Sequence, residues 1–333
     1  MLIYIFLFVF FLLGLLIKPK KQNFYFVISF VFLFILSAFR DISVGTDTES
    51  YEWLFNRVKL GFVLNRQEVG WYYFNKLILY LGGDFRWLII ISTLFILIPI
   101  FNVVRKYSLN PMLSIFLFYA LYIYIQSFNI TRQIISVSLV FASIPLLIKG
   151  KYKYYIISVF SASLFHATAL LCLPLVFIKK IPYNKKYLVL MIFITLIFGT
   201  LLSNVLLNKI VDILGYTHYL SDGDSEDAET GLFLLLTNAF AVFLIATSAK
   251  NSIYLQLFFA YILFYNIIAS VPFAYRLVYY FSVVQLLFLP YYVYNNKFKQ
   301  SYLALFIVLV YATLFFIRTF GSAGVIPYKG VLF

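Results

Sequence analysis

Long apolar runs, separated by short polar stretches, repeat along almost the whole of this 333-residue chain. Most runs have the length needed to cross a hydrocarbon core of roughly 30 Å, and only helices or closed barrels satisfy the backbone in lipid. The predicted spans cover residues 1–17, 24–39, 87–104, 111–128, 133–148, 187–207, 231–247, 252–271, 274–294 and 300–317. We therefore expect an all-α polytopic membrane protein with about ten transmembrane helices in a single domain, residues 1–333.

The apolar segment 154–178 is an exception to this pattern. Read as one span, it would place the lysines of KKIPYNKK (179–186) outside and invert every later span, against the positive-inside rule. We expect instead a re-entrant helical hairpin, with half-helices near 154–165 and 167–178 and a bend at Phe165–His166–Ala167. Non-helical backbone at that depth is tolerated only where it is buried in protein or lines a wet cavity. A tilted pair of longer helices is the alternative.

Composition agrees with the apolar pattern. Only 11% of residues are charged, against about a quarter in a soluble domain, and mean hydropathy is +0.96. The net charge of +14 does not indicate nucleic-acid binding, because the basic residues sit in short loops where they set topology. The chain has one cysteine, which excludes a disulfide framework and a thiolate metal cluster.

Charge also orients the predicted helices. The first apolar run has no basic region before it and leads directly into Lys18, which favours a first span with an outer N-terminus over a cleaved signal peptide. The inner loops then carry mainly Lys, and all 12 Asp and Glu fall outside. Two outer loops are long. Residues 40–86 include an interfacial helix near 71–81, and residues 208–230 hold an acidic tract, for which a solvated loop is favoured over a metal site.

Arginines and tyrosines at the outer face are candidates for anion and sugar contacts. Arg40, Arg132 and Arg276 lie at span boundaries, where their forked guanidinium groups could bind one phosphate group; snorkelling to lipid phosphates is the alternative. Tyr279 and Tyr280 follow Arg276 by one helical turn and could stack on sugars, or belong to the aromatic belt. No nucleotide-binding motif occurs, so we expect a pre-activated donor and neither cofactor nor metal.

One outer stretch, FRDISVGTDTESYEWLF (39–55), resembles the R-x(4)-G-[TA]-D-x(3)-Y-x(3)-F signature of EpsG-type, Wzy-like polysaccharide polymerases. Four later stretches resemble further blocks of that family in the same order. They are EVGWYYFNKLI (68–78), ITRQIISVSLVF (130–141), SLFHATALL (163–171) and YRLVYYF (275–281). The resemblance covers about residues 30–290. It implies no role for Arg318 or Tyr328.

The resemblance implies a membrane-embedded glycosyltransferase of the GT-C kind. Such enzymes polymerise oligosaccharide repeat units linked to undecaprenyl diphosphate at the outer leaflet of the bacterial cytoplasmic (inner) membrane, with the active site facing the periplasm. A flippase and a chain-length regulator are the candidate protein partners. The positions implied as catalytic are His166, Asp47, Arg132 and Arg276. The positions implied or suggested as substrate-binding are Arg40, Thr46, Tyr51, Glu68, Gln133, Tyr279 and Tyr280.

The acceptor hydroxyl needs a general base, and His166 and Asp47 are the candidates. We favour His166, with Asp47 orienting a sugar or an arginine, while arginines stabilise the departing lipid diphosphate without a metal. A buried histidine is also commonly only structural. The rival functions are a lipid-linked oligosaccharide flippase or other transporter, and an outer-face O-antigen ligase or acyltransferase. Charge gathered at one face and the lack of an internal repeat favour the enzyme over the transporter.

Overall fold

The computed structural model describes residues 1–17, 19–62, 68–181, 183–214, 231–248, 251–269, 275–296, 300–319 and 324–331. Over these residues the regular elements are all helices, with one isolated β-bridge between Arg40 and Gly330. The predicted all-α class is therefore confirmed. The number of about ten spans and the GT-C-like arrangement stay predictions.

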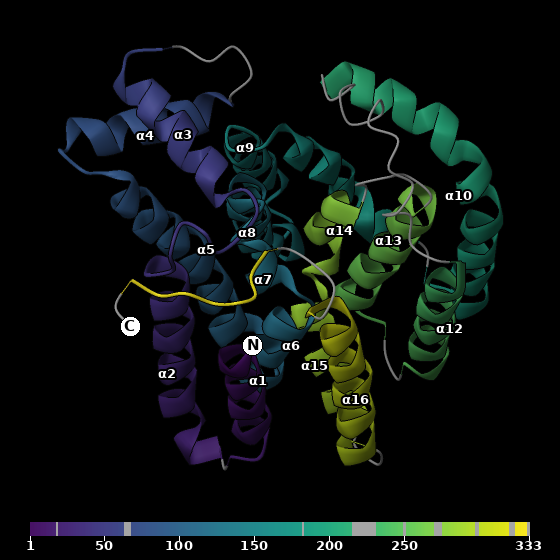
Figure 1. Ribbon diagram of the computed structural model, residues 1–333. Helices are drawn as coiled ribbons and strands as arrows, with labels where there is room; N and C mark the ends of the chain where they lie inside the picture. The colour runs from purple at the N-terminus through teal and green to yellow at the C-terminus, as the bar shows by residue number, and fades with distance from the viewer. Residues whose placement is uncertain are drawn as a thin grey trace.

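Helices of the first half of the chain pack around α6 and α8, except that α3 and α4 lie at one end of the molecule (Figure 1). They are α1 (Leu2–Leu15), α2 (Pro19–Ala38), α3 (Thr48–Lys59), α4 (Val69–Tyr80), α5 (Phe85–Tyr107), α6 (Pro111–Ala120), α7 (Ile123–Gln126), α8 (Thr131–Ile148), α9 (Tyr152–Ser163) and the 3₁₀ helix η1 (Ala167–Lys180). The second half contributes α10 (Lys185–Leu214), α12 (Gly231–Thr247), α13 (Ile253–Ile268), α14 (Tyr275–Ser282), α15 (Gln285–Asn295) and α16 (Gln300–Thr319).

Three described helices are both long and apolar enough to cross a membrane, namely Lys21–Ala38, Phe85–Tyr107 and Thr131–Ile148. Helices α14 and α15 together form a fourth candidate, bent by 40° at its break. The apolar helices Leu2–Leu15, Pro111–Ala120, Gly231–Thr247, Ile253–Ile268 and Tyr302–Ile317 are shorter. Together these apolar helices indicate a membrane protein.

Two predicted spans are interrupted. The run 111–128 divides into α6 and α7 at Tyr122, whose φ is 67°, a left-handed conformation that a residue with a side chain rarely adopts. The run 274–294 divides into α14 and α15 at residues 283–284. Periodicity could not show either break, because both sequences stay apolar through it. Tertiary packing sustains them, since Tyr122 and Val283 are almost completely buried.

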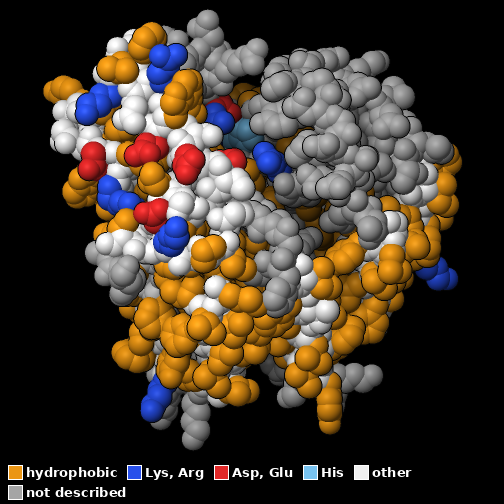
Figure 2. Space-filling model, in the orientation of Figure 1, with side chains coloured by type: hydrophobic (Ala, Val, Ile, Leu, Met, Phe, Trp, Pro, Cys, Tyr) orange, Lys and Arg blue, Asp and Glu red, His pale blue; other side chains and the backbone are white. Residues whose placement is uncertain are grey.

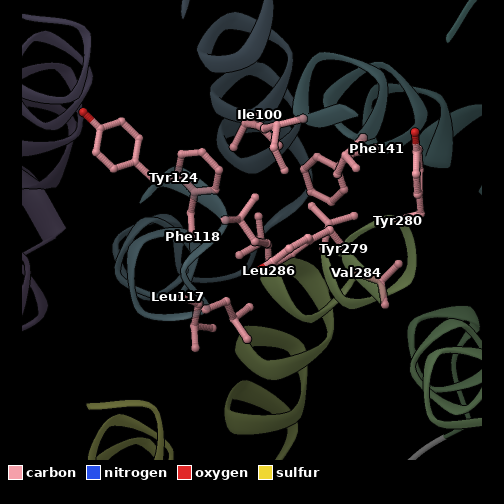
Figure 3. Packing of buried hydrophobic residues seen from close by; sticks show 14 of the residues in the cluster. Ile100, Leu117, Phe118, Tyr124, Phe141, Tyr279, Tyr280, Val284 and Leu286 are labelled. Atoms are coloured by element: carbon pink, nitrogen blue, oxygen red, sulfur yellow. The ribbon is translucent and has the colours of Figure 1, made fainter. Parts of the chain in front are cut away.

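The core lies around α6 and α8. Every residue from Met112 to Ala120 is buried, and so is 72% of the α8 span. Figure 3 shows how aromatic and branched side chains from several elements interlock here, with Phe118 and Tyr124 on one side and Tyr279 and Phe141 on the other. Polar side chains on α8 consequently face protein, where they can be held in defined positions.

The segment 154–178 is divided close to the predicted place. Helix α9 ends at Ser163 and η1 begins at Ala167, with His166 extended (φ −159°, ψ 117°) between them. The two arms contact each other and both contact α8. The break at His166 is thus confirmed, and the re-entrant path of the two arms through a membrane stays a prediction.

The loop 40–86, which is predicted to be outer, contains the helix predicted near residues 71–81 and a second helix before it. Residues 71–81 lie mostly in α4, and Thr48–Lys59 form α3, with Asp47 at its N-cap position but without a side-chain capping hydrogen bond. Acidic and basic side chains gather over this end of the molecule, whereas the lower half is mostly apolar (Figure 2). Helix α10 extends to Leu214, beyond the predicted end of its span at 207. The acidic tract of loop 208–230 lies outside the described residues.

Candidate functional site

Glu68 joins two of the predicted site residues. Its Oε2 pairs with the Arg132 guanidinium, and its Oε1 lies 2.7 Å from His166 Nδ1. The three side chains are largely shielded, with exposed fractions of 13% for Glu68, 26% for Arg132 and 15% for His166. In the chain, Glu68 is 64 positions from Arg132 and 98 positions from His166. We call these three side chains the Glu68 cluster.

A close backbone contact brings Glu68 to this position. Gly70, in the first turn of α4, donates its N–H to Leu164 O over 2.8 Å, at the break between α9 and η1. A Cβ at residue 70 would stand 2.6 Å from that carbonyl oxygen, so glycine permits the approach. On the other side, Ser136 Oγ donates to Ala162 O over 2.9 Å, which ties α8 to the same break. Ser136, one helical turn after Arg132 on α8, therefore contacts the His166 region.

The carboxylate of Glu68 is held in its ionised form. Burial raises its pKa, but the hydrogen bond with His166 and the charge of Arg132 outweigh burial and lower the pKa to about 2. An ionised carboxylate only accepts hydrogen bonds, so Nδ1 of a neutral His166 carries the proton. In that tautomer Nε2 is the basic nitrogen of the ring. Glu68 thus orients and polarises His166.

Tyr51 supports Arg132 from the other side. The Arg132 Cζ lies 5.7 Å from the centroid of the Tyr51 ring, which in turn packs 5.5 Å from Trp71 of α4. Tyr51 is buried, and burial is the main reason that its pKa is raised. The predicted substrate-binding residue Tyr51 therefore contacts Arg132 within the protein.

The loop before α3 docks against the residues that precede Arg132. Thr46 N donates to Asn129 Oδ1 over 2.7 Å. Gly45 has a φ of 97°, and a Cβ there would stand 2.8 Å from both Asn129 Oδ1 and Phe128 O. Asp47 is half-buried and accepts a hydrogen bond from Thr46 Oγ1 at 3.1 Å. Asn129, directly before the third resemblance block, thus joins it to the first block, a role that sequence reasoning missed because neither block by itself indicates a contact with the other.

The C-terminal segment 324–331 runs along the same loop (Figure 1). Gly45 N donates to Gly324 O, Asp41 N to Lys329 O and Val331 N to Phe39 O, each over 2.9 Å. Tyr328 Oη donates to Leu36 O at the end of α2, also over 2.9 Å. The sequence carried no motif that could have revealed this contact, since the segment is short and distant in the chain.

The hydrogen-bond and stacking partners of the Arg40 side chain lie outside the Glu68 cluster, although Arg40 was predicted to share one anion with Arg132 and Arg276. Its side chain is buried, donates to Ser37 O over 2.7 Å and stacks on Phe128 with Cζ 4.9 Å from the ring centroid. Burial lowers the pKa of Arg40 to about 10. None of its hydrogen bonds reaches Glu68, His166 or Arg132. Arg40 thus supports the junction between α2, the loop and Phe128.

Helix α14 lies beside the Glu68 cluster. Gln133, next to Arg132, donates from Nε2 to the backbone oxygen of Arg276 over 2.7 Å. Thr168 Oγ1, two residues after His166, donates to Tyr280 Oη over 3.2 Å. Tyr280 is 1% and Tyr279 6% exposed, and both pack among apolar neighbours (Figure 3). The predicted sites on α8, η1 and α14 therefore meet, with both tyrosines inside the protein.

The described residues contain no ready-made metal site. Within the described part of the chain, no three His, Cys, Asp or Glu side chains gather as a metal site. What the cluster offers chemically is a carboxylate-oriented imidazole beside a guanidinium group.

A sequence model of the EpsG family matches residues 23–330, nearly the whole chain. No curated protein and no solved structure matches the chain. The matched range runs from α2 to the C-terminal segment and includes the loop before α3 and the Glu68 cluster. The chain therefore belongs to the EpsG family of polysaccharide polymerases.

Proposed function

We propose that this protein polymerises oligosaccharide repeat units carried on undecaprenyl diphosphate at the outer leaflet of the bacterial cytoplasmic membrane. It transfers the growing chain from one lipid carrier to the non-reducing end of a new lipid-linked unit. The observation that carries the proposal is Glu68, which holds His166 and Arg132 together. A base and a cation placed side by side suit a transfer in which a hydroxyl loses a proton while a diphosphate leaves.

His166 acts as the general base in this proposal. Its Nε2 takes the proton of the acceptor hydroxyl as that oxygen attacks the anomeric carbon of the donor sugar. The bond between the anomeric carbon and the diphosphate oxygen breaks, and the lipid diphosphate departs. Glu68 is a positioning residue, because it fixes the His166 tautomer and stabilises the imidazolium that forms.

Arg132 and Arg276 stabilise the departing diphosphate. Guanidinium groups held in place before the reaction can offset the charge that develops on the leaving oxygen, without a metal ion. Gln133 is next to Arg132, and its side chain donates a hydrogen bond to the backbone of Arg276. This contact favours the pairing of the two arginines. Thr46 is exposed and Asp47 half-buried, so we assign them to orienting the acceptor sugar.

The test uses the full chain in nanodiscs with lipid-linked repeat units. We expect His166→Ala to lower the polymerisation rate by about 10²-fold or more, the usual contribution of a general base. Glu68→Gln should lower the rate and shift its pH profile, because an amide cannot replace the carboxylate beside His166. Glu49→Gln is the matched control, since Glu49 is exposed on α3. Retained polymerisation in His166→Ala would remove His166 from this role.

A cellular measurement separates this proposal from its rivals. A strain that lacks the gene should carry surface polysaccharide capped with a single repeat if polymerisation is lost. Loss of every outer repeat would indicate a flippase instead. Transfer to a different acceptor, such as a lipid A core, would indicate a ligase.

A further inference from the structure

A large cavity lies beside the candidate site, between helices of the second half of the chain. Its volume is about 760 Å³, and α12, α13, α14 and α16 form most of its wall. Such a volume is within the usual range for small-molecule sites, roughly 300–1,000 Å³. Most of the lining side chains are apolar or aromatic, among them Phe240, Phe258, Ile262, Tyr279 and Leu314.

The cavity opens at the surface between α12 and α16. Leu236 and Phe243 on α12, and Phe306 and Ile317 on α16, line it and are 40–58% exposed. Deeper lining residues, such as Tyr279 and Ile262, are buried. Because the rim is formed by apolar side chains on apolar helices, the opening suits entry from the hydrocarbon of a bilayer.

Helix α14 contacts residues next to the Glu68 cluster and also lines the cavity. Arg276 and Tyr280 are tied to Gln133 and Thr168, next to the cluster. Val278, Tyr279 and Ser282 of the same helix line the cavity. An amphiphile could therefore place an anionic group near Arg132 and Arg276 while its tail extends along the other face of α14.

We propose that this cavity binds the polyprenyl chain of the substrate's lipid carrier. The identity of the lipid rests on the proposed function, whereas its binding place rests on the cavity. The ligand matches the protein in charge and in polarity. Its anionic diphosphate head suits the arginines, and its long apolar tail suits the apolar cavity. Because the tail comes from the bilayer, where it is already out of water, close packing against the cavity wall and contacts of the diphosphate supply the binding free energy.

Binding of radiolabelled undecaprenyl diphosphate to the full chain in nanodiscs tests the proposal. Ala239→Trp places an indole in the cavity from α12, and Thr313→Trp does so from α16; both positions line the cavity and are exposed, so folding should be retained. Ala246→Trp is the matched control, because Ala246 is exposed on α12 but does not line the cavity. We expect the first two variants to bind the probe about tenfold more weakly than the unsubstituted chain. The control should bind it as tightly as the unsubstituted chain.

The outcomes separate this inference from the proposed function. If both cavity variants bind undecaprenyl diphosphate like the unsubstituted chain, the inference falls, even if polymerisation is intact. If phosphatidylglycerol displaces the probe at equal concentration, the cavity is a general lipid cleft and the inference also falls. If binding depends on the cavity while polymerisation is absent, the inference stands and the proposed function fails.

Discussion

At the scale of single residues, the site depends on two glycines as much as on charged groups. Gly70 lets the start of α4 touch the Leu164 carbonyl, which sets Glu68 against His166. Gly45 lets the loop before α3 lie on Phe128 and Asn129. In both places the atom that a Cβ would meet includes backbone, which cannot move aside as a flexible side chain can.

Gly70→Ala should therefore impair catalysis more than it impairs folding. The added methyl pushes Glu68 away from His166, so we expect at least a tenfold loss of polymerisation rate. Gly231→Ala is the control, since a Cβ there meets nothing within 4 Å. A Gly70→Ala variant with unchanged rate and pH profile would show that the Glu68–His166 contact is not needed.

A second glycine pair tests the loop. Gly45 and Gly61 both have positive φ, at 97° and 87°, but only Gly45 faces neighbouring atoms. Alanine at either position brings a backbone strain of roughly 1–2 kcal/mol, and at Gly45 a steric clash adds to it. Thermal unfolding in detergent should show a larger drop in melting temperature for Gly45→Ala than for Gly61→Ala. Equal losses would contradict the packing of the loop against Asn129.

At the scale of elements, the short and interrupted pieces build the site. The break between α9 and η1 presents His166, and the break between α14 and α15 ends the helix that carries Arg276. The segment 324–331 pairs with residues 39–45 and thereby fixes the loop that holds Thr46 and Asp47. Unpaired backbone groups at such breaks find partners in neighbouring elements, which positions them firmly.

Tyr328→Phe tests the contribution of the C-terminal segment. The change removes the hydrogen bond to Leu36 O, which is worth about 1 kcal/mol. We expect a lower melting temperature and reduced polymerisation, because the loop loses part of its support. Tyr302→Phe on α16 is the matched control, with Tyr302 77% exposed. A Tyr328→Phe variant as stable and active as the control would assign the segment no supporting role.

At the scale of the whole molecule, polar and apolar side chains concentrate at different ends. On the face in Figure 2, acidic and basic side chains gather around α3 and α4, while the lower half is mostly hydrophobic. The predicted orientation puts this charged end outside, and the loop between α8 and α9 inside. Because the Glu68 cluster lies where α4 meets the α9–η1 break, the same orientation would place it at the outer face.

Thiol labelling in intact cells can test that orientation. The single cysteine, Cys172, is buried and can be replaced by alanine to give a background without thiols. In that background a membrane-impermeant reagent should label Ser50→Cys but not Lys151→Cys; both positions are exposed. The reverse pattern of labelling would invert the topology and place the cluster inside.

Apolar pattern and charge together predicted the helical class, the helix break at His166, and a helix at the place of α4. These features depend on local sequence: runs of apolar residues, turn residues, and a histidine within an apolar segment. Sequence reasoning, through the family resemblance alone in the case of Glu68, named His166, Glu68 and Arg132 individually. It placed Glu68 with the substrate, and it grouped Arg40 with Arg132 and Arg276 on one anion, because spacing within one segment says nothing about contacts between segments.

The sequence by itself thus determined which residues are candidates and how the chain is divided into apolar helices, since hydropathy and charge are properties of local stretches. Only the tertiary structure decided that Glu68 joins His166 to Arg132, that Arg40 is buried against Phe128, and that the C-terminal segment supports the loop before α3. Those contacts join residues separated by 64 to 292 positions. They arise from close packing of helices and breaks, for which no local pattern carries a signal.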